Sequence, residues 1–138
     1  MAILIGIDTG VHTGFAVWHS DTKYLAEVST MTITQAIERV KMIAYIRGKD
    51  NIRLFIEDAR QRKWFGNAGR EKLQGAGSVK RDSRIWEDWC REQGFQYRMV
   101  APKNNRTKLT ASQFKLLTKW TGATSEHARD SALLVFGR

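Results

Sequence analysis

The stretch AILIGIDTGVHTGFAVWHS, residues 2–20, predicts the start of a sheet. In AILIGID every second residue is isoleucine, and Leu4, Gly6 and Asp8 take the alternate positions, so one face of the strand is apolar and the other ends in an acid. TGVHTG holds the glycines of a turn, and FAVWHS has the pattern of a returning strand. We therefore expect a buried hairpin whose first strand carries Asp8 at its end.

The following segments extend this sheet and cover it with helices. KYLAEVSTM continues the meander, and Thr32 with Gln35 forms a capping-box signal for a helix that runs to about Gly48. Core strands are also expected at 52–58 and 95–102, and helices at 71–93, at 111–122 with Gly122 closing it, and from near Ser125. This order predicts one α/β domain, residues 1–138, in which a five-stranded mixed sheet of an antiparallel meander plus parallel strands is flanked by helices.

The composition limits the class of protein. The 138 residues, 42% of them hydrophobic, fit one domain with a real core. Cys90 is the only cysteine, which excludes an internal disulfide and is typical of a reducing compartment, so a cytoplasmic location is expected. The apolar start MAILIGI is far shorter than the ~20 residues of a membrane span and has no basic segment before it, so neither a membrane nor a signal peptide is expected.

Positive charge is concentrated in two zones of a chain whose formal net charge is +9. Residues 60–84 hold eight Lys or Arg and two Asp or Glu, while residues 98–119 hold six Lys or Arg and no acid. Each zone therefore nets +6, and the rest of the chain nets −3. Two basic zones on a mildly acidic body indicate a surface for a polyanion such as nucleic acid. The alternative is a solvated basic face without such a partner.

Acidic residues close two of the predicted strands. Asp8 ends the first strand, and Glu57 and Asp58 end the strand IRLFIED. Open α/β sheets place ligand sites at strand ends, and carboxylates buried together favour a bound cation. Because successive strand side chains point to opposite faces, only one of Glu57 and Asp58 can join Asp8. Both faces of the strand are apolar, so the sequence leaves either as the partner.

A histidine and an aspartate begin the last predicted helix. His127 and Asp130 are three residues apart and so share one helix face. Capping by Ser125 or Thr124 places His127 in the first turn, where the helix dipole favours a neutral imidazole with a free ligand nitrogen. Carboxylates suit Mg²⁺ or Mn²⁺, and the imidazole favours Mn²⁺. The candidate catalytic and metal-binding set is Asp8, Glu57, His127 and Asp130.

Four ordered segments resemble the RuvC-type Holliday junction resolvases of the RNase H-like, or retroviral integrase, superfamily. They are IGIDTGVHTGFAV, LFIEDAR, LQGAGSVKRD and HARDSALLVFG, and the likeness spans nearly the whole chain. The chain is shorter than the usual bacterial members, and the segment after Glu57 is longer and more basic. The resemblance implies an RNase H-like fold and a compact, phage-like nuclease in the cytoplasm of a bacterium or of a phage-infected host.

The resemblance also implies an active site with two Mg²⁺ or Mn²⁺ ions. Asp8 would be the metal ligand of the first strand and would bridge both ions, Glu57 would be the acid of the central strand, and Asp130 the acid of the final helix. His127 falls where the family carries aspartate or histidine, and it either ligates a metal or positions the attacking water. Such ions clamp the scissile phosphate, one activating water and the other stabilising the leaving 3′ oxygen.

The expected substrate is branched DNA, above all the four-way junction, whose phosphates would contact the basic zones. Trp64 and Phe65 either stack on exposed bases or anchor their loop to the domain. The near two-fold symmetry of a junction predicts a homodimer with two active sites, with Trp86 and Trp89 at the interface or in the core. The candidate nucleic-acid-binding residues are Arg60, Arg62, Lys63, Trp64, Phe65, Lys72, Lys80, Arg81, Lys103, Arg106 and Lys108.

Three other functions compete with this one. Actin-like ATPases also open with a strand, an acid and a glycine turn, but they need a second phosphate-binding turn and a second domain, which the sequence lacks. A catalytically inactive nucleic-acid-binding module of the same fold is disfavoured by the four candidate ligands. A nuclease acting on flaps, forks or RNA-containing duplexes would keep the same site and change only the substrate.

Overall fold

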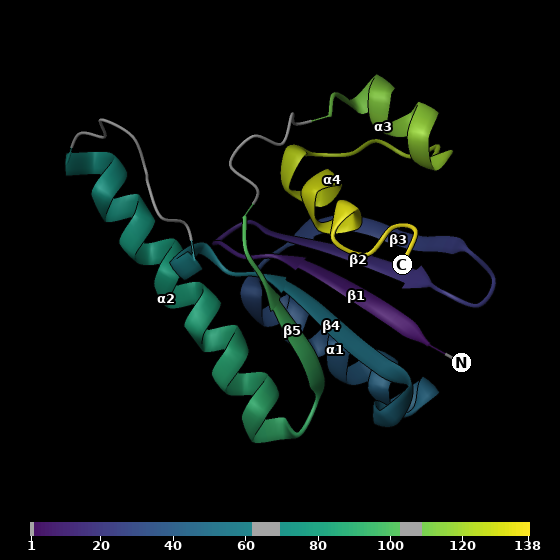
Figure 1. The fold of residues 1–138 in the computed structure, drawn as a ribbon, viewed down its shortest axis with the longest axis horizontal. Coiled ribbons are helices and arrows are strands. Elements are labelled where there is room, and N and C mark those ends of the chain that lie inside the picture. The colour runs from purple at the N-terminus through teal and green to yellow at the C-terminus, as the bar shows by residue number, and fades with distance from the viewer. Residues whose placement is uncertain (1, 62–69, 103–108) are drawn as a thin grey trace.

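A five-stranded mixed sheet forms the centre of the protein, as the sequence predicts. The computed structural model describes residues 2–61, 70–102 and 109–138. The central strand β1 (Ile3–Asp8) pairs antiparallel with β2 (Thr13–His19), and β2 with β3 (Tyr24–Met31). On its other side β1 runs parallel to β4 (Ile52–Glu57), which runs parallel to β5 (Gln96–Val100). The order β3-β2-β1-β4-β5 (Figure 1) confirms the predicted α/β class and is consistent with an RNase H-like arrangement.

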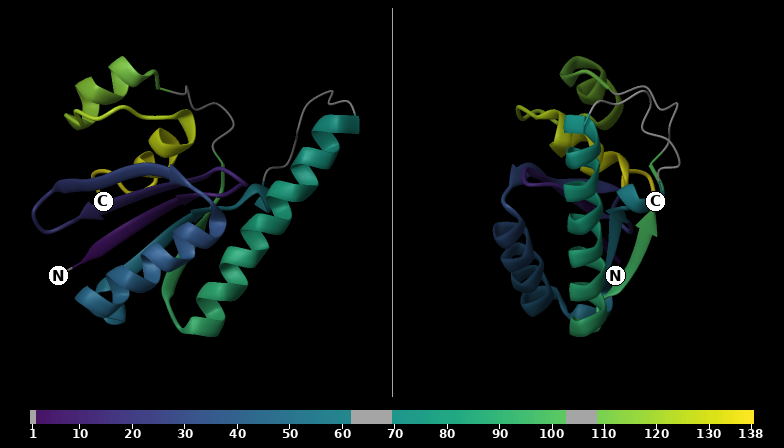
Figure 2. Two further views of the ribbon diagram at one scale, coloured as in Figure 1. Left: turned by 180° about the vertical axis from the view of Figure 1, so that it is seen from behind. Right: turned by 90° about the vertical axis from the view of Figure 1, so that its left-hand side faces the viewer.

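Helices cover both faces of this sheet (Figure 1). α1 (Ile33–Arg47) and α2 (Arg70–Gln93) pack on one face, and α3 (Ala111–Thr118) and α4 (Glu126–Leu133) on the other. Two short 3₁₀ turns, η1 (Lys49–Asn51) and η2 (Ala59–Gln61), flank β4. The N-terminal half of α2 extends past the ends of the strands (Figure 2). The helix therefore projects beyond the sheet at the end where β1 and β4 finish.

The alternation in AILIGID builds two cores, one on each face of β1. Ile3, Ile5 and Ile7 join the core beneath α1 and α2, which also contains Trp86 and Cys90. Leu4 joins the core beneath α3 and α4, together with Ala16, Trp18, Phe55, Phe114, Ala128 and Ala132. Both faces of β1 are therefore buried, as expected for the central strand of a sheet covered on both sides.

Two glycines allow α4 to lie directly on the strands. A Cβ atom at Gly6 would lie 2.1 Å from the carbonyl oxygen of Ser131, and one at Gly14 would lie 2.0 Å from that of His127. Both distances are far shorter than an ordinary van der Waals contact, so any larger residue would push the helix off the sheet. Thr30 of β3 also hydrogen-bonds Ser125, which attaches the start of α4 to the edge of the meander.

The predicted capping box of α1 is confirmed. Thr32 Oγ1 accepts a hydrogen bond from Gln35 N at 3.2 Å, and Gln35 Oε1 accepts one from Thr32 N at 2.9 Å.

The prediction that Gly122 closes α3 is wrong, because the helix ends at Thr118. Lys119 adopts the left-handed conformation, with φ 64°, and caps the helix by donating its N–H to the carbonyl of Lys115.

The tertiary structure corrects the expectation for β5 and decides between the two alternatives for Trp86. β5 was expected to be a core strand, but it is the edge of the sheet, with Gln96 and Arg98 exposed and the remaining residues only partly buried. Trp86 is fully buried, so it is core and unavailable to a dimer interface, whereas Trp89 is partly buried between Trp86 and Phe95.

None of the helices in the described ranges combines the length and apolarity that a membrane span requires.

Candidate active site at the ends of β1 and β4

Asp8 and His127, 119 residues apart in the sequence, are in direct contact. His127 Nδ1 lies 3.0 Å from Asp8 Oδ2. The contact follows from the position of α4 on the sheet. Gly14 is paired with Asp8 across the hairpin, and the backbone of His127 packs directly against Gly14. A Cβ atom at Gly14 would also lie 3.0 Å from Asp8 Cβ. Gly14 is therefore the position that lets the two candidate residues meet.

The two partners differ in their exposure to solvent. The side chain of Asp8 is 11% exposed, whereas that of His127 is 49% exposed. Ser125 Oγ accepts the N–H of Ala128 at 3.1 Å, so Ser125, one of the two predicted caps, begins α4 and places His127 in its first turn. When Nδ1 carries the proton and donates to Asp8, the lone pair of the imidazole lies on Nε2. In that tautomer His127 can accept a proton or bind a cation.

The structure decides which acid at the end of β4 accompanies Asp8. Parallel pairing sets Gly6 beside Phe55 and Ile7 beside Ile56. Phe55 belongs to the core beneath α4 and Ile56 to the core beneath α1 and α2. Since side chains alternate, Glu57 shares the face of Phe55, Gly6 and Asp8. Glu57 is thus the acid on the face of Asp8.

Asp58 has a structural role instead. It is 4% exposed, and its carboxylate accepts hydrogen bonds from Arg60 Nε at 2.7 Å, Arg60 Nη2 at 3.0 Å and Gln61 Nε2 at 3.1 Å. Arg60 Nη2 also donates to Glu87 Oε1 of α2 at 2.8 Å. Burial raises the pKa of Asp58, but the hydrogen bonds from Arg60 and Gln61 outweigh it and hold that pKa below its usual value. This cluster attaches the turn η2 to α2.

A second, uncharged network holds the backbone on either side of Asp58. Ser83 Oγ, on α2, accepts the N–H of Ala59 at 3.2 Å and lies 3.3 Å from the carbonyl oxygen of Glu57. Thr9 Oγ1 lies 3.2 Å from Ser83 Oγ and 3.3 Å from the same carbonyl. Ser83 and Thr9 are both buried, so these hydroxyls connect the residue after Asp8 to the backbone of Glu57.

Sequence reasoning missed Thr9, Ser83 and a further residue, His12. Ser83 precedes Trp86 by three positions and Cys90 by seven, so its helical spacing places it on the same buried face, and this signal was available. His12 lies in the turn between β1 and β2, and its ring is roughly parallel to that of His127, with centroids 6.4 Å apart. No pattern in the sequence predicts that the rings of His12 and His127 lie next to each other.

The remaining candidate residues are placed as follows. Asp130 is partly buried on α4, one turn after His127. Arg60 is turned inward to Asp58 and Glu87, while Lys80 is partly buried and Arg81 is exposed on α2. Arg62, Lys63, Trp64, Phe65, Lys103, Arg106 and Lys108 lie outside the described residues, as does the side chain of Lys72.

The donor chemistry of the four candidate ligands suits a hard divalent cation, since it offers three carboxylates and one imidazole. Asp8 and Glu57 also face the same side at neighbouring strand ends. Within the ranges that the structure describes, however, no three His, Cys, Asp or Glu side chains are grouped closely enough to hold a metal ion.

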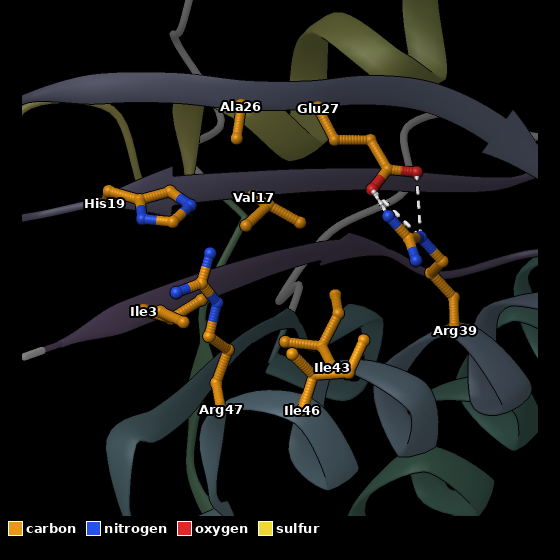
Figure 3. Close-up of a pocket in the computed structure, with 9 residues that line it drawn as sticks. All are labelled: Ile3, Val17, His19, Ala26, Glu27, Arg39, Ile43, Ile46 and Arg47. Carbon is orange, nitrogen blue, oxygen red and sulfur yellow. Dashed lines mark hydrogen bonds and ion pairs between the residues drawn. The ribbon is translucent and has the colours of Figure 1, made fainter.

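A hollow of about 210 Å³ between α1 and the meander offers no such donor set (Figure 3). Apolar side chains, including Ile3, Val17 and Ile43, form much of its lining. Its one carboxylate, Glu27, is paired with Arg39, whose Nη2 lies 3.0 Å from Glu27 Oε2. The hollow is also beside the start of β1, so it is remote from Asp8, which ends the same strand.

Comparison of the chain with protein-family models and with curated proteins finds no match.

Proposed function

We propose that the protein is a metal-dependent endonuclease that cleaves branched DNA, as the RuvC-type resolvases that its sequence resembles do. The observation that carries the proposal is the contact between Asp8 Oδ2 and His127 Nδ1 at 3.0 Å, with Glu57 on the same face of the adjacent strand. An acid–imidazole pair beside a second strand-end acid supplies donor types that phosphodiester hydrolysis with a divalent cation can use.

Asp8, Glu57 and Asp130 would hold Mg²⁺ or Mn²⁺, with His127 as a further ligand or as the residue that orients water. When bound, such ions supply an activated water and stabilise charge on the phosphate and on the leaving 3′ oxygen. The hydrogen bond to Asp8 fixes the orientation of the His127 ring. Because Ser83 and Thr9 hold the Glu57 carbonyl, the backbone that carries the second acid has little freedom to move.

Substrate binding would rest on the two basic zones, which attract phosphates without reading sequence. A homodimer with one site in each subunit suits the near two-fold symmetry of a four-way junction. Its interface would have to use residues other than Trp86, which is 0% exposed within its own core. The proposed location is the cytoplasm of a bacterium or of a phage-infected host, where such DNA intermediates arise.

The deciding experiment is incubation of the purified protein with end-labelled four-way junction, fork and linear duplex in Mg²⁺, in Mn²⁺ and in EDTA. We expect metal-dependent nicking of the branched substrates. Asp8→Asn should abolish the nicking and leave junction binding intact, because the basic zones carry the affinity. Asp21→Asn is the matched control, since Asp21 is an exposed acid in a turn and asparagine keeps the acceptor for Thr22 N.

Other outcomes would revise the proposal in defined ways. Equal cutting of linear duplex would remove the specificity for branched DNA, and faster cutting of RNA-containing duplexes would change the substrate class. Junction binding with no nicking in either metal would favour the inactive nucleic-acid-binding module. Loss of binding in Asp8→Asn at low salt would give Asp8 a structural role.

A further inference from the structure

A groove of about 660 Å³ lies on α3, away from the ends of β1 and β4. It is lined by Ser112, Lys115, Leu116, Lys119, Trp120 and Thr121. Two of these side chains are cationic and none is acidic, and no acid occurs between residues 98 and 119. Leu116 is 75% exposed, so an apolar side chain lines the groove together with the two lysines. The groove thus offers positive charge and apolar contact together.

The shape of the groove depends on how α3 ends. Lys119 leaves the helix in the left-handed conformation, and the next residue, Trp120, donates its N–H to Thr118 Oγ1 at 3.2 Å. Thr118 Oγ1 in turn donates to the carbonyl of Phe114 at 2.8 Å. Trp120 packs partly against the core beneath α3 and α4 while it also lines the groove. These bonds hold the tryptophan beside the lysines.

Lys115 lies in the last turn of α3 and Lys119 is the residue that caps the helix, and both side chains line the groove. Both positive charges would attract a bound polyanion, whereas they would not favour a neutral or basic partner. The apolar surface beside the lysines suits the base or sugar of a nucleotide, and an aromatic side chain that lies next to cations is a common platform for single-stranded nucleic acid. Charge and chemistry therefore favour a nucleic-acid strand as the occupant.

The groove is joined firmly to the helix that carries half of the candidate active site. Phe114 of α3 is fully buried against the core shared with α4. Arg129 of α4 donates to the carbonyl of Leu109, just before α3, at 3.0 Å and to the carbonyl of Thr124 at 2.8 Å. Arg129 follows His127 by two residues, so a strand held on α3 is held at a fixed position relative to His127.

We infer that the groove on α3 binds one strand of the nucleic-acid substrate outside the cleavage site, with Lys115 and Lys119 on its phosphates and Leu116 and Trp120 against a base or sugar. The inference rests on the nucleic-acid partner in the proposed function but not on cleavage. It adds these four residues to those expected at the nucleic-acid interface.

The test measures binding of a fluorescent four-way junction and of a single-stranded oligonucleotide in EDTA, where no cleavage competes, over a range of salt concentrations. Lys115→Gln/Lys119→Gln should lower the slope of log Kobs against log salt by about 2, one for each phosphate that the protein no longer neutralises. The matched control is Lys23→Gln/Lys41→Gln. It removes the same charge from one left-handed lysine, Lys23 with φ 56°, and one helical lysine far from α3.

A second pair of variants tests the apolar contact. Leu116→Ser should weaken binding of the single strand several-fold without changing the salt slope, while Leu117→Ser, at a neighbour that is 51% exposed and does not line the groove, should not. Equal salt slopes for the two lysine pairs would overturn the inference, as would a wild-type protein that binds no nucleic acid. A change in oligomeric state in Leu116→Ser, with DNA binding unaltered, would instead identify the groove as a protein interface. Binding without cleavage would refute the nuclease proposal alone.

Discussion

Replacement of Gly14 by alanine tests the claim that this glycine creates the contact between Asp8 and His127. The added Cβ would lie 2.0 Å from the carbonyl oxygen of His127 and 2.6 Å from its carbonyl carbon. Ordinary contact begins near 3.4 Å, so α4 would have to move by about 1.4 Å, the difference between 3.4 and 2.0 Å. The obstructing atoms are helix backbone, so no side-chain rotation can relieve the overlap.

Gly14→Ala is expected to lower the stability of the protein and to break the contact between Asp8 and His127. Forcing a methyl group into a packed core costs about 1–3 kcal/mol of unfolding free energy. A shift of α4 by more than an ångström would also carry the 3.0 Å contact between Asp8 and His127 beyond hydrogen-bond range. The variant should therefore be less stable in urea denaturation, and the imidazole NMR signals of His127, recorded at one fixed pH, should have different chemical shifts from those of the wild type.

Gly77→Ala provides the control, because it is the same substitution at a helical glycine where an added Cβ meets no atom within 4 Å. Removing a glycine from a helix interior should stabilise the protein by about 0.5–1 kcal/mol. Gly14→Ala is thus expected to lower the free energy of unfolding, and Gly77→Ala to raise it. A Gly14→Ala protein with wild-type stability and unchanged His127 chemical shifts would refute the reasoning that α4 rests on Gly14.

Three further predictions concern the surroundings of the site. Arg60→Gln should lower the free energy of unfolding by about 1–3 kcal/mol at neutral pH, because the buried Asp58 carboxylate loses the two hydrogen bonds from the guanidinium. Since the Asp58 pKa is held low, this stabilisation exists above the usual aspartate pKa and is lost as the pH falls through the native pKa. Acid unfolding followed by circular dichroism should therefore begin at higher pH in the variant, and an unshifted midpoint would contradict the role of the Asp58–Arg60 cluster. Ser83→Ala should destabilise the protein and lower the rate of junction cleavage, because the buried N–H of Ala59 loses its acceptor, whereas Ser78→Ala, a partly buried serine on the same helix, should do neither. Burial raises the pKa of Cys90 to about 12, so a thiol reagent at pH 8 should label it only after denaturation; rapid labelling of the native protein would show that the core opens there.

Local patterns were sufficient for most of the fold. The alternation in β1 and the Thr32–Gln35 capping box each depend on residues that are close in sequence, and the structure confirms both. The end of α3 was mispredicted because a left-handed lysine, which is disfavoured in isolation, ends the helix before the glycine does. The position of β5 at the edge was not predictable, because strand order depends on pairing between distant segments.

In the candidate site, too, local patterns predict some features and only the tertiary structure decides others. Asp8, His127, Asp130 and the pair Glu57 and Asp58 could be selected from the sequence because acids at strand ends and an acid with imidazole at one helical turn are local patterns. The choice between Glu57 and Asp58 needed the register between β1 and β4, which sets the face of each side chain. Likewise, the burial of Asp58 with Arg60 appears only once η2 is packed against α2.

Periodicity and composition within short windows were enough to establish the class of the fold, the burial of β1 and the residue types available for chemistry. The seat of α4 on Gly6 and Gly14, which brings His127 to within 3.0 Å of Asp8, became apparent only from the packing of the folded chain. The physical reason is steric. A glycine in the sequence shows that no side chain is present at that position. Which backbone occupies the space depends on how a helix more than 100 residues later packs against the sheet.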